Sequence, residues 1–142
     1  MDDLLLSLKF DHVGIATISI EKSIKSFEVI GYNAATRIIY DENQDVKVCF
    51  LTKLKSPRIE LIEPHSSNSP IALLLKKNNG IIPYHFCYQV KSMDETISNL
   101  TSQGFIKITN PSPSPAFNNN KVCFLFKQNM GIVELVEIST HV

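Results

Sequence analysis

The chain contains one sequence module written twice. The segment Lys47–Leu51 recurs without a change as Lys121–Leu125. The spacing from Gly31 to Gly104 is one residue shorter than the spacing from Lys47 to Lys121, so one residue has been gained or lost between Gly31 and the repeated segment. A duplication of this size predicts two similar halves that pack as repeated units of structure.

The duplication also repeats two side chains that bind metals. His12 and His85 are separated by the same spacing as the two glycines, and Glu60 and Glu134 by the same spacing as the repeated segments. Two halves that face each other bring these four potential ligands to their common seam. The repeat therefore predicts one metal site built equally from both halves.

The composition fits a small globular protein. The 142 residues, 44% of them apolar, suit a single domain made of a first module (8–64), a linker (65–81) and a second module (82–138). Fourteen basic side chains balance fourteen acidic ones, so no general field would gather nucleic acid or an anionic membrane. We expect a small-molecule partner.

The sequence carries no recognisable export signal. The apolar patch at the start follows acidic residues, not basic ones, and no stretch approaches transmembrane length. Cys49, Cys87 and Cys123 form an odd set without CxxC spacing, and two of them occupy matched positions in the repeats. We expect a cytoplasmic protein with reduced core cysteines.

Each module reads as strand, helix and three further strands. In the opening strand of the first module, His12 points away from the apolar face formed by Val13 and Ile15. In the second module His85 likewise points away from the apolar face of its strand. The predicted strands are Phe10–Thr17, Thr36–Tyr40, Val46–Leu51 and Arg58–Ile62 in the first module and Tyr84–Val90, Phe105–Thr109, Lys121–Phe126 and Gly131–Glu137 in the second.

Helix signals follow each opening strand. Ser19 can cap the first helix and Gly31 can end it, while Ser92, with a capping box to Glu95, and Gly104 do the same in the second module. A short linker helix is expected over 71–77, and the loop over 110–120, rich in Pro, Ser and Asn, is expected to contact substrate.

A helix on one face of each sheet leaves the other face free for the four ligands. Glu63 and Glu137 fall on the opposite side or past the strand end, so they are not expected to bind metal. The predicted fold is α+β, with two tandem βαβββ modules forming a curved mixed sheet around a metal-binding cleft and helices on the outer face.

Two imidazoles and two carboxylates suit one divalent ion such as Co, Mn, Ni or Zn. Four protein ligands leave two places on an octahedral ion for a substrate with two adjacent oxygens.

At this point the sequence resembles the vicinal oxygen chelate superfamily, which includes glyoxalase I, methylmalonyl-CoA epimerase, extradiol dioxygenases and bleomycin-resistance proteins. The resemblance covers 10–138 and is strongest at Asp11–Ala16, Ile59–Pro64, Ser69–Ile71, Tyr84–Phe86 and Val133–Glu137. Among these groups the chain is most similar to the methylmalonyl-CoA epimerases.

The resemblance implies a metal-dependent epimerase or isomerase that stabilises the enolate of an acyl thioester such as methylmalonyl-CoA. In the epimerases the positions of His12, His85 and Glu134 bind metal, and the position of Glu60 holds Glu or Gln. Proton transfer needs a base and an acid on opposite faces. Glu134 is the first candidate for this chemistry.

The chain departs from the epimerase pattern in the first module. The alignment places Asn43 where the epimerases have a catalytic glutamate, and asparagine cannot accept the proton. Glu42 is the neighbouring carboxylate and the second catalytic candidate, although adjacent side chains on a strand point to opposite faces.

Other functions fit parts of the pattern. A glyoxalase I-like lactoylglutathione lyase would use Glu134 or Glu60 to move the proton of a hemithioacetal. A non-catalytic antibiotic-binding protein commonly lacks the ligand set, and an extradiol dioxygenase needs only two histidines and one carboxylate. Resemblance to the family also suggests a homodimer. Lys53, Lys55, Arg58, Lys76 and Lys77 could meet the phosphates of a CoA-type ligand, although a solvated face is the commoner explanation.

Overall fold

The computed structural model describes residues 3–138, and these hold four α-helices, ten β-strands and one short 3-10 helix. Contacts divide the chain into two compact units, His12–Tyr84 and a second unit made of the residues up to Asp11 and those from His85 onward. Each unit combines helices with a mixed sheet, so the predicted α+β class is confirmed. Within the described residues, no helix is both long enough and apolar enough to cross a membrane.

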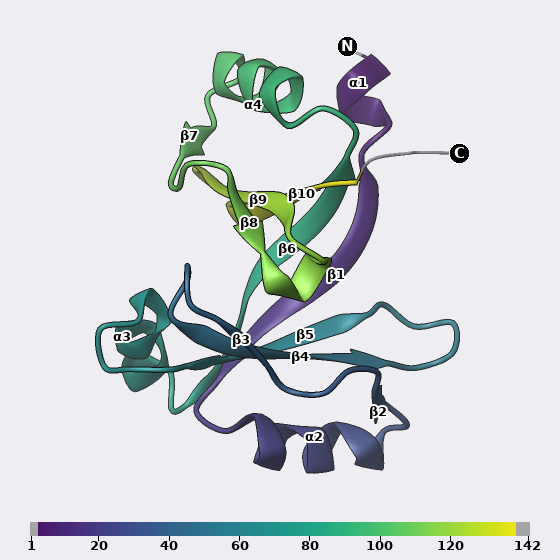
Figure 1. The fold of residues 1–142 in the computed structure, drawn as a ribbon, viewed down its shortest axis with the longest axis vertical. Coiled ribbons are helices and arrows are strands. Elements are labelled where there is room, and N and C mark those ends of the chain that lie inside the picture. The colour runs from purple at the N-terminus through teal and green to yellow at the C-terminus, as the bar shows by residue number, and fades with distance from the viewer. Residues whose placement is uncertain (1–2, 139–142) are drawn as a thin grey trace. The chain divides into compact units, whose positions relative to one another are not determined.

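The unit His12–Tyr84 builds a four-strand path with one helix along a face of its sheet (Figure 1). The strand order is β2-β4-β5-β1, with β3 also paired to β4; β1 and β5 run parallel, and β4 and β5 antiparallel. Its elements are β1 (Lys9–Thr17), which begins before the unit, α2 (Ile20–Val29), β2 (Asn33–Ala34), β3 (Ile39–Asp41), β4 (Val46–Thr52), β5 (Ile59–Pro64) and α3 (Pro70–Lys77).

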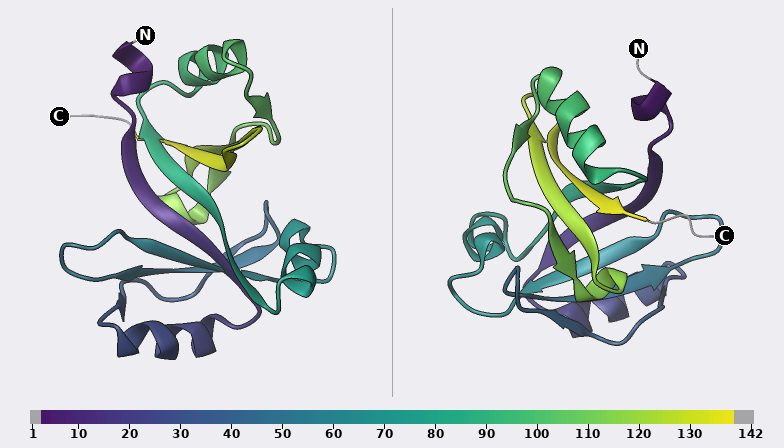
Figure 2. Two further views of the ribbon diagram at one scale, coloured as in Figure 1. Left: turned by 180° about the vertical axis from the view of Figure 1, so that it is seen from behind. Right: turned by 45° about the horizontal axis from the view of Figure 1, so that its top comes forward.

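The other unit repeats this plan, as the views in Figure 2 show. The order is β6-β10-β9-β7, with β8 also paired to β9; β6 and β10 run parallel, and the remaining pairs antiparallel. Its elements are α1 (Asp3–Leu6), β6 (Ile81–Val90), which begins before the unit, α4 (Met93–Ser102), β7 (Ile106–Lys107), β8 (Ser112–Ser114), a 3-10 helix (Pro115–Phe117), β9 (Asn120–Lys127) and β10 (Gly131–Glu137).

The serine caps and the glycine stops read from the sequence are confirmed. The hydroxyl oxygens of Ser19 and Ser92 each accept the backbone N–H three residues on, at 3.2 and 3.4 Å. Gly31 and Gly104 follow the helices with φ of 97° and 92°, a conformation that costs glycine little. The expected linker helix is α3, and α1 is an element that sequence patterning did not indicate.

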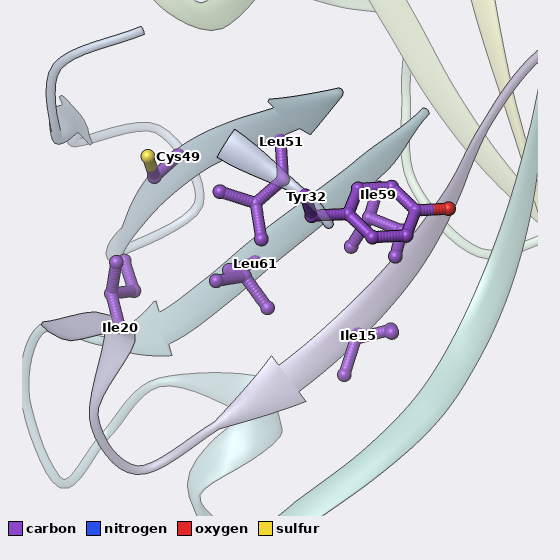
Figure 3. Close-up of a cluster of buried hydrophobic side chains, with 7 residues drawn as sticks. All are labelled: Ile15, Ile20, Tyr32, Cys49, Leu51, Ile59 and Leu61. Atoms are coloured by element: carbon purple, nitrogen blue, oxygen red, sulfur yellow. The ribbon is translucent and has the colours of Figure 1, made fainter. Parts of the chain in front are cut away.

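The helices α2 and α4 each bury an apolar stripe against one face of their own sheet. In the first unit this core joins strand and helix side chains with the ring that follows Gly31 (Figure 3): Ile15, Ile20, Tyr32, Cys49, Leu51, Ile59 and Leu61. The matched core of the second unit comprises Val90, Met93, Leu100, Cys123, Leu125, Val133 and Leu135. The opposite faces of the two sheets are therefore left for other side chains.

The cysteines are free and buried, as expected. Burial raises the pKa of the Cys49 and Cys123 thiols, although a hydrogen bond with Thr36 or Thr109 partly opposes this effect. Both thiols therefore stay protonated and poorly reactive near neutral pH.

Two short strands follow each helix where the sequence predicted a single strand; β3 overlaps the predicted Thr36–Tyr40, and β7 lies within the predicted Phe105–Thr109. Instead of Thr36–Tyr40, the first unit has β2 and β3 as two short pieces on β4, and the second unit has β7 and β8 on β9. The expected loop over 110–120 therefore contains β8 and the 3-10 helix.

A threonine hydroxyl explains the break in each unit. The Thr36 hydroxyl accepts the Phe50 N–H at 3.1 Å, and the Thr109 hydroxyl accepts the Phe124 N–H at 3.0 Å. In each unit the hydroxyl accepts an N–H that a backbone carbonyl of the edge strand would otherwise accept. The edge strand is therefore interrupted at the threonine.

The structure also locates the one-residue difference between the repeats. Asp41 and Ser114 end β3 and β8, and the spacing between them is one residue shorter than that between Val46 and Asn120, which begin β4 and β9. The difference falls in the turn between these strands, which is one residue longer in the second module. The candidate Glu42 lies in this turn.

Candidate functional site

A buried histidine and a buried glutamate meet on the free face of the first sheet. Gly14 of β1 is in register with Glu60 of β5, and His12 precedes Gly14 by two residues, so both side chains lie on the face away from α2. His12 Nε2 lies 3.3 Å from Glu60 Oε1, and the two residues are 0% and 4% exposed. The sequence prediction that these residues share a face is consistent with this pair.

The second unit builds the same pair. Glu134 of β10 is in register with Cys87 of β6, and Cys87 lies two residues after His85 on the same strand. His85 Nε2 lies 3.1 Å from Glu134 Oε1, and the residues are 4% and 2% exposed. Each repeat thus presents one imidazole nitrogen beside one carboxylate oxygen, almost fully removed from water.

A phenylalanine of the repeated segment braces each histidine. The rings of His12 and Phe50 meet edge to face with centroids 5.5 Å apart, and those of His85 and Phe124 at 5.4 Å. Each phenylalanine is also the cross-strand partner of the glutamate in its pair. The repeated segment was used only as evidence of duplication, but it supplies the ring that fixes the orientation of each imidazole.

Glu63 and Glu137, which were excluded as ligands, act at the helices instead. A carboxylate oxygen of Glu63 accepts the Ile20 N–H at 2.9 Å, and Glu137 accepts the Met93 N–H at 2.7 Å. Each carboxylate thereby satisfies a backbone donor in the first turn of a helix of its own unit, α2 for Glu63 and α4 for Glu137, where negative charge is favourable.

The pair geometry suits ligands of one ion. Two donor atoms, each about 2.1 Å from an ion, are about 3.0 Å apart at a right angle and about 3.4 Å apart at a tetrahedral angle. The observed separations of 3.3 and 3.1 Å lie in this interval. Burying charged carboxylates is costly unless a positive partner offsets the lost hydration, and a divalent ion is such a partner. The residues present therefore fit a divalent metal.

The structure does not bring Glu42 or Asn43 to the His12–Glu60 pair. Both are exposed in the turn between β3 and β4. Phe50 opposes Glu60, whereas the turn ends at Val46, four residues earlier on β4. Four strand residues span roughly 13 Å.

Sequence reasoning missed a buried carboxylate beside this turn. Asp41 ends β3, and its two oxygens accept the backbone N–H and side-chain amide of Gln44 at 3.2 and 3.1 Å. Its pattern of hydrogen bonds is that of a residue that closes a turn, and the Asp-x-x-Gln spacing was the signal for it.

A family model decides the relationship. The model of the Glyoxalase/Bleomycin resistance protein/Dioxygenase superfamily matches residues 11–124. The chain belongs to this superfamily. The resemblance seen in the sequence is thereby confirmed, and the paired modules of the fold agree with it.

Proteins with similar sequences match this chain over nearly its whole length. The uncharacterized protein YqjC of Bacillus subtilis (strain 168) is 30% identical over 132 residues, covering 91% of both chains. The ethylmalonyl-CoA/methylmalonyl-CoA epimerase of Cereibacter sphaeroides is 28% identical over 134 residues, covering 92% of this chain and 98% of the relative.

The fold is also that of a solved epimerase. The crystal structure of methylmalonyl-CoA epimerase from Mycobacterium tuberculosis has a TM-score of 0.79 and 24% identity, and the match covers 92% of this chain and 88% of that one. The likeness establishes the vicinal oxygen chelate type of fold.

Proposed function

We propose that the protein is a metal-dependent isomerase or epimerase that forms the enolate of an acyl thioester such as methylmalonyl-CoA. The observation that carries this proposal is the buried His–Glu pair, repeated at matched positions of the two modules. Membership of the superfamily and the similarity to epimerases along most of the chain support it.

In this proposal His12, Glu60, His85 and Glu134 bind one divalent ion, Co, Mn, Ni or Zn. Each module supplies one neutral imidazole and one carboxylate, so the two carboxylates balance the charge of the ion. When bound, the ion supplies Lewis-acid stabilisation of the negative oxygen that develops as the substrate loses its α-proton, an effect of several kcal/mol.

The chain's own residues position the ligands and move the proton. Phe50 and Phe124 hold the imidazole rings edge to face, which fixes the nitrogen that points toward each carboxylate. Glu134 has a second carboxylate oxygen that can take a proton while the first remains directed at the ion. Burial on the free sheet face keeps these side chains away from bulk water.

Solvent exchange tests the proposed reaction. Metal-loaded protein in deuterium oxide is expected to place deuterium at C2 of methylmalonyl-CoA and to interconvert its two epimers, as followed by mass spectrometry and chiral analysis. Exchange into the hemithioacetal of glutathione and methylglyoxal, without exchange into the thioester, would instead favour the lactoylglutathione lyase. Absence of both reactions in protein with stoichiometric metal would favour a binding protein.

The role of Glu42 as the second proton-transferring group stays a prediction. Because Glu42 lies in an exposed turn, we expect its replacement to have a small effect on the exchange rate. Because roughly 13 Å of strand separates this turn from the level of Glu60, we expect Glu42→Gln to change the exchange rate by less than about threefold. Asn43→Asp, which adds a carboxylate at the neighbouring position, tests whether a carboxylate in this turn affects the exchange rate. A loss of about 100-fold in Glu42→Gln would support its catalytic role.

A further inference from the structure

A cavity of about 260 Å³ lies in the second unit, between the N-terminal segment, the end of β6 and the first turn of α4. The short helix α1 begins this segment and lies beside α4 (Figure 1). The apolar walls of the cavity come from Leu4, Leu8, Val90 and Ile138. Because Val90 is five residues from His85 on β6, roughly 16 Å of strand separates the cavity from that histidine.

The polar side chains in the walls already have partners within the chain. The Ser7 hydroxyl donates to the backbone carbonyl three residues earlier at 2.8 Å, and the Thr96 hydroxyl to the carbonyl four residues earlier at 2.7 Å. The Gln89 side-chain amide donates to the Asp11 carboxylate at 2.7 Å. Polar groups that are paired in this way need no further partner inside the cavity. The interior therefore suits an apolar occupant.

Two lysines lie at the mouth of the cavity. Lys9 and Lys91 line it and are both exposed, an arrangement in which the alkyl stem follows the apolar wall and the ammonium group stays in water. Among residues 3–138, no carboxylate pairs with either lysine and no acidic side chain lines the cavity. The mouth is therefore positively charged.

The repeated fold does not need these two charges. In the spacing that relates the two histidines of the repeat, Lys9 corresponds to Ile82 and Lys91 to Ile18. The other module thus folds with an isoleucine at both positions. A pair of cations added at the mouth of an apolar cavity is complementary to a ligand with an anionic end and an apolar body.

The size of the cavity indicates how long this apolar body is. A dry apolar cavity of about 150 Å³ admits benzene, whereas pockets for drug-sized ligands begin near about 300 Å³. The available 260 Å³ lies between these limits. One unbranched chain of about eight carbons fits this range. A terminal carboxylate would then lie at the mouth, within reach of charge-assisted hydrogen bonds from the ammonium groups.

We propose that this cavity is a binding site for a medium-chain carboxylate such as octanoate, with the alkyl chain inside and the carboxylate held by Lys9 and Lys91. The site uses none of the metal ligands and does not depend on the proposed reaction. Because the N-terminal segment forms one wall, a bound chain adds apolar contacts between this segment and the rest of the second unit.

Calorimetry with a series of unbranched carboxylates tests the cavity. Affinity is expected to rise about fourfold for each methylene added from butanoate to octanoate, because each buried methylene contributes a similar transfer free energy. It should level off or fall once the chain exceeds about ten carbons, since a closed cavity cannot take in more volume. An affinity that keeps rising through dodecanoate would indicate open apolar surface, and absence of saturable binding at millimolar octanoate would also overturn the site.

Replacement of the two lysines tests the charged end of the site. Lys9→Gln combined with Lys91→Gln is expected to lower octanoate affinity by about tenfold and to leave the affinity for the neutral octan-1-ol within about twofold. Lys107→Gln combined with Lys121→Gln is the matched control, because it removes the same charge from exposed positions of the same unit. An equal loss in the control would mean general attraction and would overturn the carboxylate contact.

Methyl NMR spectroscopy locates the bound chain. Octanoate should shift the methyl signals of Leu4, Leu8, Val90 and Ile138, which line the cavity. Binding should be unchanged when EDTA is added, because the carboxylate does not use a metal ion. Loss of binding with EDTA would place octanoate at the proposed metal site and overturn the cavity site, whereas unchanged binding supports it whatever the outcome of the exchange assay.

Discussion

Replacement of both His12 and His85 by alanine is expected to abolish stoichiometric metal binding and to lower the exchange rate by at least about 1,000-fold. Each change removes the nitrogen donor from one buried pair and leaves a carboxylate alone to hold the ion. A Lewis-acid contribution of several kcal/mol corresponds to a rate factor of this size, since a change of about 1.4 kcal/mol in the barrier alters a rate tenfold. Metal analysis of purified protein and the C2 exchange assay measure the two effects.

His65→Ala is the control, because it removes a histidine that is not one of the proposed metal ligands. His65 packs against Tyr40 with the rings tilted and their centroids 4.3 Å apart, and it has no counterpart in the second module. We expect this variant to retain metal and rate. Circular dichroism of the double variant separates loss of metal from loss of fold, and a folded double variant that still holds one ion per chain would contradict the ligand assignment.

The features that sequence could predict are those with local or repeated signals. Ser19 and Ser92 cap helices through contacts three residues away, and Gly31 and Gly104 end them through their own backbone conformation. Strand alternation placed each histidine opposite the apolar face without knowledge of its neighbours. The repeat then extended each conclusion from one module to the other.

The features that sequence missed depend on contacts between distant segments. A threonine in a strand-like run gives no sign that its hydroxyl will accept an N–H from a distant strand and interrupt the edge strand, as Thr36 and Thr109 do. The role of Phe50 beside His12 likewise exists only once β1, β4 and β5 are assembled. Periodicity indicates which face a side chain occupies, but not which neighbour it meets.

Glu134→Gln is expected to lower the C2 exchange rate by about 100- to 1,000-fold, whereas Glu60→Gln should lower it by no more than about tenfold. Glutamine keeps an oxygen donor and nearly the same shape in both variants, but an amide cannot accept a proton at neutral pH. Because the epimerases hold Glu or Gln at the position of Glu60, we propose Glu134 and not Glu60 as the group that transfers the proton. Rates and metal content of the two variants should be measured together.

The two glutamates form a matched pair for this comparison because their surroundings are so similar. Each lies beside an imidazole, at 3.3 Å for Glu60 and 3.1 Å for Glu134, each opposes a phenylalanine, and both are buried. A difference in rate between the variants therefore reports the chemistry of each carboxylate and not its burial or packing. Equal large losses would instead mean that both carboxylates move protons, as the symmetry of the modules permits, and would contradict the assignment of proton transfer to Glu134 alone.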